Sequence, residues 1–466
     1  MFLVLGLGPI EVYYSNYDEF SFTNFDYIFI FGALLVITFA IVNTVVLVLP
    51  RNINKVVISI LTAISVASYI QYMFLNKNLI MEDGEFIEAD GLGGYSLQSL
   101  FIYIGIIVVI SVLIFVFRKK TYEIITAVSG FILVITMIAV LSLFLTHITS
   151  KKERLWYSGV DQFKVASDEN VIVFVPDAFG RTALNAMLQQ YPDAVDFLND
   201  FTFYENEDSM YFPTYPALHH MLTDYPYDEA MSRFEYTKDA FESENARLFF
   251  NRLHDKDYSV RLYTNDILFE HVTQGIADNI EEAHITTDRA SLFKFLYKMS
   301  MYRYVPYSLK AAFQVDTLEL SNISQYNGIG PHHLNSEFYS EMQNQGITID
   351  DKIQNAFILH HIRGTHMPYI SNANNELVEA NSVSGEETSY GTMRLIEEYL
   401  ERLKDIGKYD DATIIIVADH GFYDTDSIFY IKEKGESHDQ TVVDSEMITH
   451  ADFQDIVLKS IDNIED

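Results

Sequence analysis

Residues 170–177 read NVIVFVPD, and this stretch decides the fold of the chain. Its five consecutive apolar side chains predict a strand that is buried on both faces, as in a parallel sheet covered by helices. Three further short runs are also strand candidates, and they are Tyr258–Tyr263, Ala356–Leu359 and Thr413–Val417. Because helical stretches separate these runs from Val171–Val175 and from each other, the sequence predicts an α/β domain with a largely parallel central sheet.

Acidic and imidazole side chains follow three of these runs directly. Asp177 follows the first run, His361 and then His366 follow the third, and Asp419 and His420 follow the fourth. Ligands of open α/β sheets bind beyond the carboxyl ends of the strands. A single aspartate after a strand is commonly a turn residue. Three such groups at one edge of a sheet favour a metal centre.

The segment FPTYPAL, residues 212–218, contains a candidate nucleophile and leads into a helical pattern. Thr214 would lie at the start of that helix, where the helix dipole and free N–H groups stabilise an alkoxide or a bound phosphate. A nearby metal would lower the pKa of its hydroxyl further. From position alone, the simpler reading that Thr214 is an N-cap is equally good.

The clearest amphipathic helix is RLIEEYLERLK, Arg394–Lys404, which turns into the last strand candidate. Two polar stretches, Ser321–His333 and Ile370–Glu387, are predicted to be loops that overhang the site.

The first 150 residues have a different character, because they contain long apolar runs. Four runs are long enough to span a bilayer, which needs about 20 apolar residues; they are Tyr27–Leu49, Val56–Phe74, Leu100–Phe117 and Ile124–Leu145. Each is apolar on all faces, which argues against buried core helices. Met1–Ile10 is similar but shorter, and we expect it to be the tail of a fifth helix that ends at Pro9.

The charges of the connecting loops predict the orientation. Arg51 and Lys55 lie in one loop and Arg118–Lys120 in another, so both are expected to be cytoplasmic. The alternate loops, residues 11–26 and 81–90, are acidic. Alternation places everything after Leu145 outside the cytoplasm, against the weaker contrary signal of Lys151, Lys152 and Arg154. We therefore expect a multi-pass membrane anchor over 1–150, a linker over 151–169 and an extracytoplasmic catalytic domain over 170–466.

The bulk composition excludes some functions. The 466 residues carry a formal net charge of −34, which argues against nucleic acid as a partner because its phosphates would be repelled. The chain has no cysteine, so disulfides and cysteine-based catalysis are excluded. A domain of this size needs no disulfide framework.

Four motifs, in order along the chain, resemble those of the alkaline phosphatase/sulfatase superfamily. They are NVIVFVPDAFGRTAL with the first metal aspartate, FPTYPALHHMLTD with the nucleophile, HIRGTHMPY with a substrate histidine, and YDDATIIIVADHG with the closing metal ligands. The last is the most specific. The resemblance covers the chain from about Asn170 onward, and the apolar half is similar to the anchors of lipoteichoic acid synthases and phosphoethanolamine transferases.

The resemblance implies an alkaline-phosphatase-like fold and roles for particular residues. Asp177, Thr214, Asp419 and His420 would bind one divalent metal, and oxygen ligands with one imidazole suit Mn²⁺, Zn²⁺ or Mg²⁺. Thr214 would also be the nucleophile that forms a phospho-threonine intermediate. His366 would contact the transferred group or protonate the leaving oxygen. His366 and His361 are the candidate substrate-binding residues.

Departures from the family motifs narrow the class of enzyme within the superfamily that this chain resembles. Sulfatases mature a cysteine or serine in a C/S-x-P-x-R pattern, whereas this chain has Thr214, keeps Pro216 and has Leu218 in place of the arginine. Ala178 stands where the family often has glycine. Two-metal members have an aspartate four residues before the histidine, where this chain has Ile362. Phosphoethanolamine transferases usually have another histidine shortly after the DHG segment, whereas the next histidine of this chain is His438. His450 is expected to be a structural residue before a terminal helix.

The leading hypothesis is a membrane-bound transferase. It would move a phosphoglycerol or phosphoethanolamine group from a lipid donor to a cell-envelope glycan or glycolipid. A phosphodiesterase, phosphatase or sulfatase-like hydrolase of the same superfamily is the alternative within this chemistry. A catalytically silent binding module of the envelope is the alternative from another class.

Overall fold

The computed structural model describes residues 2–17, 20, 22–76, 89–147, 155–264, 268, 270–282, 285–315, 319, 323–326 and 328–462. These residues form two compact units. The first unit is Met1–Arg154 with His284–Asn327, and the second is Leu155–Ala283 with Gly328–Asp466. Residues 284–327 therefore group with the apolar helices, although they come from the half of the sequence that we assigned to the catalytic domain. Residues 155–169, from the expected linker, belong to the second unit.

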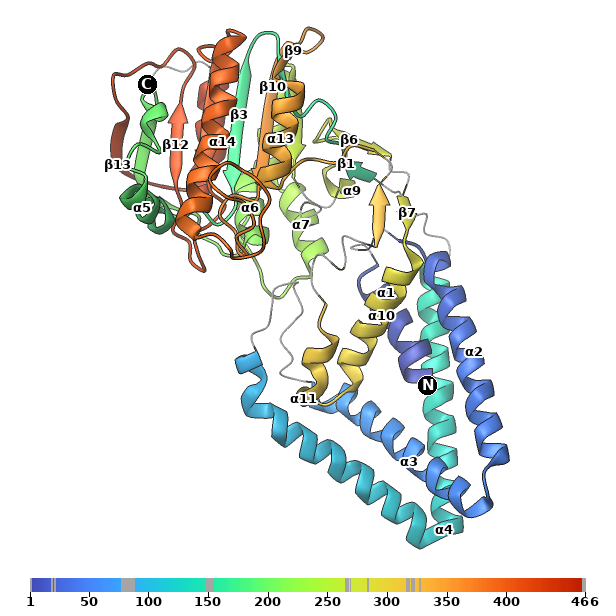
Figure 1. Cartoon of the computed structure of the whole chain (residues 1–466). Coiled ribbons are helices and arrows are strands. Elements are labelled where there is room, and N and C mark those ends of the chain that lie inside the picture. Colours follow the sequence, from blue (N-terminus) through green and yellow to red (C-terminus); the bar gives the residue numbers. More distant parts are fainter. Residues whose placement is uncertain are drawn as a thin grey trace. The chain divides into compact units, whose positions relative to one another are not determined.

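A seven-stranded sheet forms the centre of the second unit (Figure 1), in the order β13-β4-β12-β11-β3-β10-β5. Its strands are β3 (Asn170–Pro176), β4 (Thr202–Asp208), β5 (Tyr258–Tyr263), β10 (Asn355–Ile362), β11 (Ala412–Val417), β12 (Phe429–Lys432) and β13 (Val442–Thr449). The predicted runs are β3, β5, β10 and β11, so all four are confirmed. β3, β5, β10 and β11 pair in parallel, as do β13 and β4, whereas β12 is antiparallel to both of its neighbours.

Helices cover both faces of this sheet, which explains why its central strands are apolar throughout. Ile172 and Phe174 of β3 pack in one buried cluster, and Val171, Val173 and Val175 pack in another on the opposite face. The first cluster includes side chains of α5 (Arg181–Gln190), α13 (Asn335–Gln345) and α14 (Gly385–Asp405). The second includes side chains of α6 (Thr214–Thr223), α8 (Glu244–Asp255) and α15 (Phe453–Asp462).

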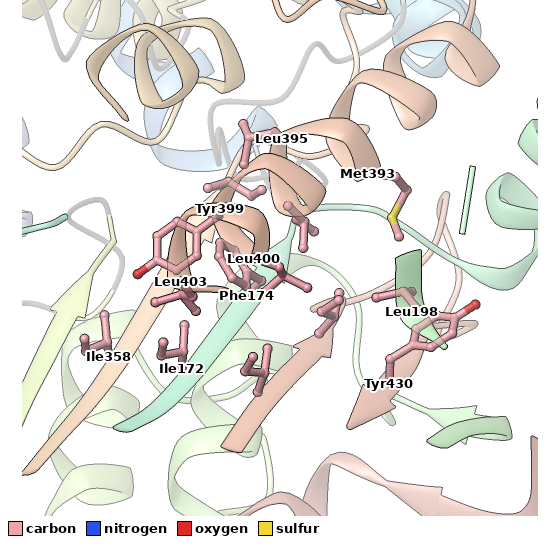
Figure 2. Packing of buried hydrophobic residues seen from close by; sticks show 14 of the residues in the cluster. Ile172, Phe174, Leu198, Ile358, Met393, Leu395, Tyr399, Leu400, Leu403 and Tyr430 are labelled. Carbon is pink, nitrogen blue, oxygen red and sulfur yellow. The ribbon is translucent and has the colours of Figure 1, made fainter. Parts of the chain in front are cut away.

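The α14 side of the sheet is a dense apolar layer, seen from close by in Figure 2. The Phe174 ring lies 5.0 Å from the ring of Tyr399, centroid to centroid, and 6.4 Å from that of Phe338. Tyr399, Leu400 and Leu403 project from the predicted amphipathic helix, which the structure confirms as part of α14.

Shorter elements complete the second unit. β1 (Leu155–Tyr157) pairs with β6 (Ile280–Glu282), and β2 (Lys164–Ala166) pairs with β9 (Thr348–Asp350). The remaining helices here are η3 (Asp196–Leu198), α7 (Arg233–Phe241), α9 (Glu270–Thr273) and η6 (His450–Asp452).

The first unit is mainly helical. Its elements are η1 (Leu3–Leu7), α1 (Gly8–Ser15), α2 (Asn24–Val48), α3 (Arg51–Ile70), η2 (Gln71–Leu75), α4 (Ala89–His147), β7 (Ile285–Thr287), α10 (Arg289–Tyr304), α11 (Tyr307–Lys310), η5 (Ala311–Phe313) and β8 (Ser324–Tyr326). β7 and β8 pair with each other. α4 changes direction along its length (Figure 1), and it contains the last two apolar runs.

Four helical stretches are long and apolar enough to cross a membrane, as predicted. They are Phe25–Val48, Arg51–Leu75, Leu97–Phe117 and Ser129–Thr146. At most 17% of any of these windows is buried inside the protein, so most of their apolar surface needs a lipid environment. The basic residues Arg51 and Lys55 lie on the first turns of α3 rather than in a loop, and residues 118–120 lie within α4.

The N-terminal segment differs from expectation. The helix does not end at Pro9, which lies in the first turn of α1, where the missing N–H of proline costs no hydrogen bond. Residues 11–15 of the expected acidic loop are helical, and the Glu11 carboxylate accepts a hydrogen bond from Tyr72. α10 packs against this segment through an apolar cluster that includes Tyr13, Phe295 and Leu296. This packing explains why residues 284–327 group with the first unit.

Several predicted features lie outside the described residues. The acidic segment 81–88 and the basic residues Lys151, Lys152 and Arg154 belong to this group, as do residues 321–322 and 327 of a predicted loop.

The packing of Phe174 predicts a large stability cost for its truncation. Phe174→Ala should lower the free energy of unfolding by about 3–5 kcal/mol, because it removes a fully buried ring between the sheet and α14. Denaturant unfolding of the second unit, followed by circular dichroism in the full detergent-solubilised chain, measures this loss. Val443→Ala on β13 is the control, since Val443 is 61% exposed and should change stability by less than about 0.5 kcal/mol. Equal effects of the two substitutions would contradict the packing described.

Candidate metal centre

Three strand ends bring acidic and imidazole groups together. β3 lies between β10 and β11, and its Val175 is in register with His361 of β10. Asp177 follows β3 and Asp419 follows β11, so parallel pairing delivers both carboxylates to the same edge of the sheet. One ligand atom each from Asp177, His361 and Asp419 lie within 4.8 Å of one another. The strand-end pattern of the sequence predicts this convergence, and the family resemblance gave His361 a substrate-binding role.

Backbone N–H groups orient the Asp419 carboxylate. Its Oδ1 accepts hydrogen bonds from the N–H groups of Ala178 and His420, both at 2.9 Å. Ala178 adopts a positive φ of 59° to make this contact, which explains why glycine suits the position. Burial raises the pKa of Asp419, but the neighbouring His420 and His361 and these N–H groups outweigh burial and hold it below the usual value. The other oxygen, Oδ2, is buried, and the nearby Thr214 hydroxyl also helps to lower the pKa of this carboxyl group.

His420 presents one ring nitrogen to this cluster. Its Nδ1 lies 2.6 Å from the carbonyl oxygen of Gly421, which can only accept, so Nδ1 carries the proton. Nε2 then faces Asp419 Oδ2 at 3.4 Å and Asp177 Oδ1 at 3.7 Å. An imidazole nitrogen and two carboxylates that converge in this way share either a proton on Nε2 or a cation that lies between them. The geometry therefore fits a divalent metal, and a carbonyl-bound Nδ1–H is the usual partner arrangement of a metal-binding histidine.

Thr214 faces the same group. Its Oγ1 lies 3.1 Å from His420 Nε2. The N-cap of α6 is Pro213, Thr214 is the first helical residue, and no side chain caps this helix. The structure thus gives no capping role to the Thr214 hydroxyl, and it places that hydroxyl beside the candidate metal ligands at a helix N-terminus.

His361 is a further candidate ligand. Its Nδ1 lies 3.1 Å from Thr264 Oγ1, and its Nε2 is buried with no hydrogen bond to a described residue. Burial lowers the pKa of His361 to about 4, so the ring is neutral at physiological pH and can offer a lone pair. His361 and His420 therefore approach the two carboxylates as alternative or joint imidazole ligands.

The loop after β10 is fastened to the residues beside Asp177. Thr365 donates its N–H to the Asp177 carbonyl at 2.9 Å and its hydroxyl to the Ala178 carbonyl at 2.6 Å. Gly364 has a φ of 55°, and a Cβ there would lie 2.6 Å from backbone atoms of Asp177. Glycine is required at this close approach. The loop places His366, whose pKa is lowered first by burial and then by the charge of Arg363.

Arg363 is a residue that the sequence analysis missed. Burial lowers the pKa of its guanidinium, the negative charge of Asp177 opposes this change, and its Nε is buried without a hydrogen-bond partner among the described residues. It stands between the two histidines of HIRGTH, so its position in that motif was the available signal. His438, in contrast, pairs with Glu436 at 2.6 Å and gives no contact to the cluster.

A partly exposed ion pair joins two loops of the site. The Asp426 carboxylate accepts from Arg181 Nε at 2.6 Å and from the N–H of Thr182 at 2.9 Å. Asp426 follows the DHG segment, and Arg181 begins α5 just after Asp177. The loops that follow Asp177 and Asp419 are therefore fixed to each other.

Comparisons with known proteins give structural neighbours only. No family model and no curated protein matches the chain. Among solved structures, the chain is similar to the lipoteichoic acid synthase LtaP from Listeria monocytogenes, with 12% identity, a TM-score of 0.36 and coverage of 66% of this chain and 74% of that one. It is also similar to the integral membrane lipooligosaccharide phosphoethanolamine transferase A from Neisseria meningitidis, with 15% identity, a TM-score of 0.34 and coverage of 98% and 95%.

A third neighbour is a protein in the alkaline phosphatase superfamily from Vibrio parahaemolyticus. The identity is 10%, the TM-score 0.35, and the match covers 64% of this chain and 67% of that one. These neighbours are of the kind that the sequence motifs resemble. Any function must be argued from the site itself.

The geometry predicts metal binding that depends on the two carboxylates. Asp419→Asn should weaken Mn²⁺ binding by at least about 100-fold, because it removes a buried charge at the centre of the cluster. Isothermal titration of the full chain in detergent measures this loss. Asp224→Asn is the matched control: Asp224 lies at the far end of α6 in a left-handed conformation that asparagine tolerates.

His361→Gln and His420→Gln compared in the same titration separate the two imidazoles. The His420 variant should lose more affinity, because His420 Nε2 also faces Thr214. Unchanged affinity in Asp419→Asn would contradict the metal centre.

Proposed function

We propose that this protein is a membrane-bound, metal-dependent phosphotransferase that acts through a phospho-threonine intermediate. The observation that carries this proposal is the position of the Thr214 hydroxyl, 3.1 Å from His420 Nε2 and at the start of α6. The motif resemblance and the oxygen-rich ligand set, Asp177, Asp419 and Thr214 with an imidazole, support the same chemistry.

The proposed reaction has two halves, which are the formation and the breakdown of the phospho-threonine intermediate. A bound divalent metal supplies positive charge that lowers the pKa of the Thr214 hydroxyl and offsets charge on the transferred group. Thr214 Oγ1 forms a bond to phosphorus, the bond from phosphorus to the lipid oxygen breaks, and diacylglycerol leaves. The proton lost by Thr214 passes through His366 to that leaving oxygen. In the second half the oxygen of an acceptor hydroxyl forms a bond to phosphorus, the bond from phosphorus to Thr214 Oγ1 breaks, and the proton of that hydroxyl passes through the same imidazole to Thr214 Oγ1.

His366 suits this role because its pKa is lowered. A neutral imidazole can accept a proton and then return it, whereas an imidazolium cannot accept one. Arg363 supports binding of an anionic group, since its buried guanidinium has donor capacity to spare and stands near Asp177 and His366.

The membrane helices support a lipid donor that carries a phosphoglycerol or phosphoethanolamine head group. A phospholipid is met at the bilayer surface, and a chain with four apolar spans is held there. An envelope glycan or glycolipid is the proposed acceptor, with the catalytic domain outside the cytoplasm.

Substitution of Thr214 tests the mechanism. Thr214→Ala should lower turnover of the phosphodiester probe bis(4-nitrophenyl) phosphate by several orders of magnitude, because it removes the nucleophile. Thr214→Ser should keep part of the activity. Thr223→Ala is the matched control on the same helix, since it also removes a hydroxyl, and that hydroxyl bonds only the His219 carbonyl. Mass spectrometry after incubation with phosphatidylglycerol or phosphatidylethanolamine should show an adduct on Thr214.

The outcomes of this test separate the candidate functions. Transfer of the head group to a glycan acceptor supports the transferase, and its release as a free product supports a hydrolase. Near-normal turnover in Thr214→Ala would overturn the nucleophile. Absence of both metal binding and turnover in the unaltered protein would support a silent binding module.

Cysteine labelling tests the proposed orientation, because the chain has no cysteine of its own that could react with the maleimide. Asp439→Cys, at an exposed position of the catalytic domain, should react with a membrane-impermeant maleimide in intact cells. Asn52→Cys, at the start of α3 on the side expected to be cytoplasmic, should react only after lysis. The reverse labelling pattern would contradict the topology.

A further inference from the structure

A histidine outside the metal centre lies between the two elements that deliver its ligands. His450 begins η6 and is 1% exposed. Its Nδ1 lies 3.3 Å from the carbonyl oxygen of Ala217, and its Nε2 lies 3.1 Å from that of Ala418. Ala217 is in the first turn of α6, which Thr214 begins, and Ala418 directly precedes Asp419. One imidazole therefore contacts both the nucleophile helix and the metal-binding strand end.

A buried carboxyl group completes this arrangement. Glu207 lies on β4, its side chain is fully buried, and its Oε1 is 3.3 Å from His450 Nε2. Ser427 also lies within hydrogen-bonding reach of this carboxyl group and opposes the effect of burial on its pKa. Glu207 therefore contacts the Nε2 side of the imidazole, and both ring nitrogens face carbonyl oxygens.

Hydrogen-bond chemistry fixes how many protons this cluster needs. A carbonyl oxygen only accepts, so Nδ1 must carry a proton toward Ala217. A second proton must lie on the side of Nε2, where Ala418 O and Glu207 Oε1 are both acceptors in the absence of that proton. Either position of the second proton leaves the pair with no net charge, but only a proton on Nε2 can be donated to the Ala418 carbonyl. Burial works against that position, since it raises the pKa of Glu207 well above its usual value and lowers that of His450 to about 4. The pair is therefore a neutral unit, and the tie to Ala418 forms when the shared proton lies on Nε2.

A second contact from the same segment holds the other end of α6. Gln454 donates from Nε2 to the Leu222 carbonyl at 2.7 Å. Leu218 and Leu222 of α6 share an apolar cluster with Phe453 and Val457 of the C-terminal segment. The segment therefore fixes the whole helix by packing, while the His450 contact is specific to the end that bears Thr214.

We propose that His450, held by Glu207, is a positioning residue that sets the separation between Thr214 and Asp419. This inference rests on the proposed function, because it assigns a role toward the same metal and nucleophile. The physical reason is that α6 and β11 are distant in the sequence, and an error of about 1 Å in their separation is enough to reduce turnover about 100-fold.

The test compares two amide substitutions of His450 in the full detergent-solubilised chain. Asn places a donor near the Nδ1 position and Gln places one near the Nε2 position, so each keeps only one of the two ties. Both variants should lower kcat for bis(4-nitrophenyl) phosphate by about 10–100-fold with KM changed less than about threefold, and weaken Mn²⁺ binding by about 10-fold. Gln454→Ala is the control, because it removes a contact to the same helix away from Thr214. It should lower the melting temperature by a similar amount and leave kcat and Mn²⁺ affinity unchanged within about twofold.

The partner residue gives a second comparison. Glu207→Gln keeps a hydrogen-bonding group of the same size against Nε2 and should retain kcat within about threefold, whereas Glu207→Ala should behave like the His450 variants. Equal losses in both Glu207 variants would contradict the tie. Unchanged kcat and Mn²⁺ affinity in both His450 variants, or losses in Gln454→Ala as large as theirs, would overturn the positioning role.

Hydrogen exchange separates this inference from the proposed function. If the unaltered protein neither binds Mn²⁺ nor turns over the probe, the proposed function fails by itself. The His450 variants should still speed amide exchange in a peptide that covers Thr214–Thr223, and Gln454→Ala should speed it less at the Thr214 end. Unchanged exchange in the His450 variants would show that no tie exists, whatever the activity.

Discussion

The charge repulsion between two carboxylates at one edge of the sheet is the constraint on which the site depends. Asp419 is completely buried, and its ligand oxygen lies within 4.8 Å of that of Asp177. At an effective dielectric constant of about 20, two like charges about 4 Å apart repel by about 4 kcal/mol. Two negative charges so placed need positive charge or donors around them. The neighbouring N–H groups, the imidazoles and Arg363 meet that requirement in part, and a divalent cation would meet the rest in the proposed function.

The fold meets this constraint with backbone geometry before any side chain contributes. The parallel register of β3 with β10 and β11 fixes which residues reach the edge. Ala178 and His420 then donate N–H groups to one oxygen of Asp419, so the other oxygen must point into the cluster. Gly364 allows the loop after β10 to approach the Asp177 backbone closely, which brings His366 and Arg363 in with it. The chemistry of the site is thus a consequence of strand order and of a few tight backbone contacts.

The sequence predicted those parts of the molecule that depend on local pattern. The four apolar runs became β3, β5, β10 and β11 because helices cover both faces of those strands, which is what a continuous apolar run requires. β4, β12 and β13 were missed. β13 is largely exposed, β4 and β13 carry polar side chains such as those of Asn206 and Asp444, and β12 has only four residues. Strand ends indicated where Asp177, His361, Asp419 and His420 would meet, but the pattern could not show which of the two imidazoles lies nearest both carboxylates.

Contacts between distant segments account for the rest of what the sequence could not predict. Residues 284–327 group with the apolar helices because the aromatic face of α10 finds partners on α1 and α2, which no local pattern of α10 reveals. His450 looked like a structural residue before a terminal helix, and its place in the chain agrees with that.

The proposed role of His450 follows from the two elements that it connects, α6 and the end of β11. α6 comes from the middle of the chain and β11 from near its end, and the segment after β13 contacts both. In the proposed mechanism, Thr214 is held in place only as well as α6 is held against the end of β11. We therefore infer that the precision of the proposed centre depends on a C-terminal segment that contributes no ligand to it.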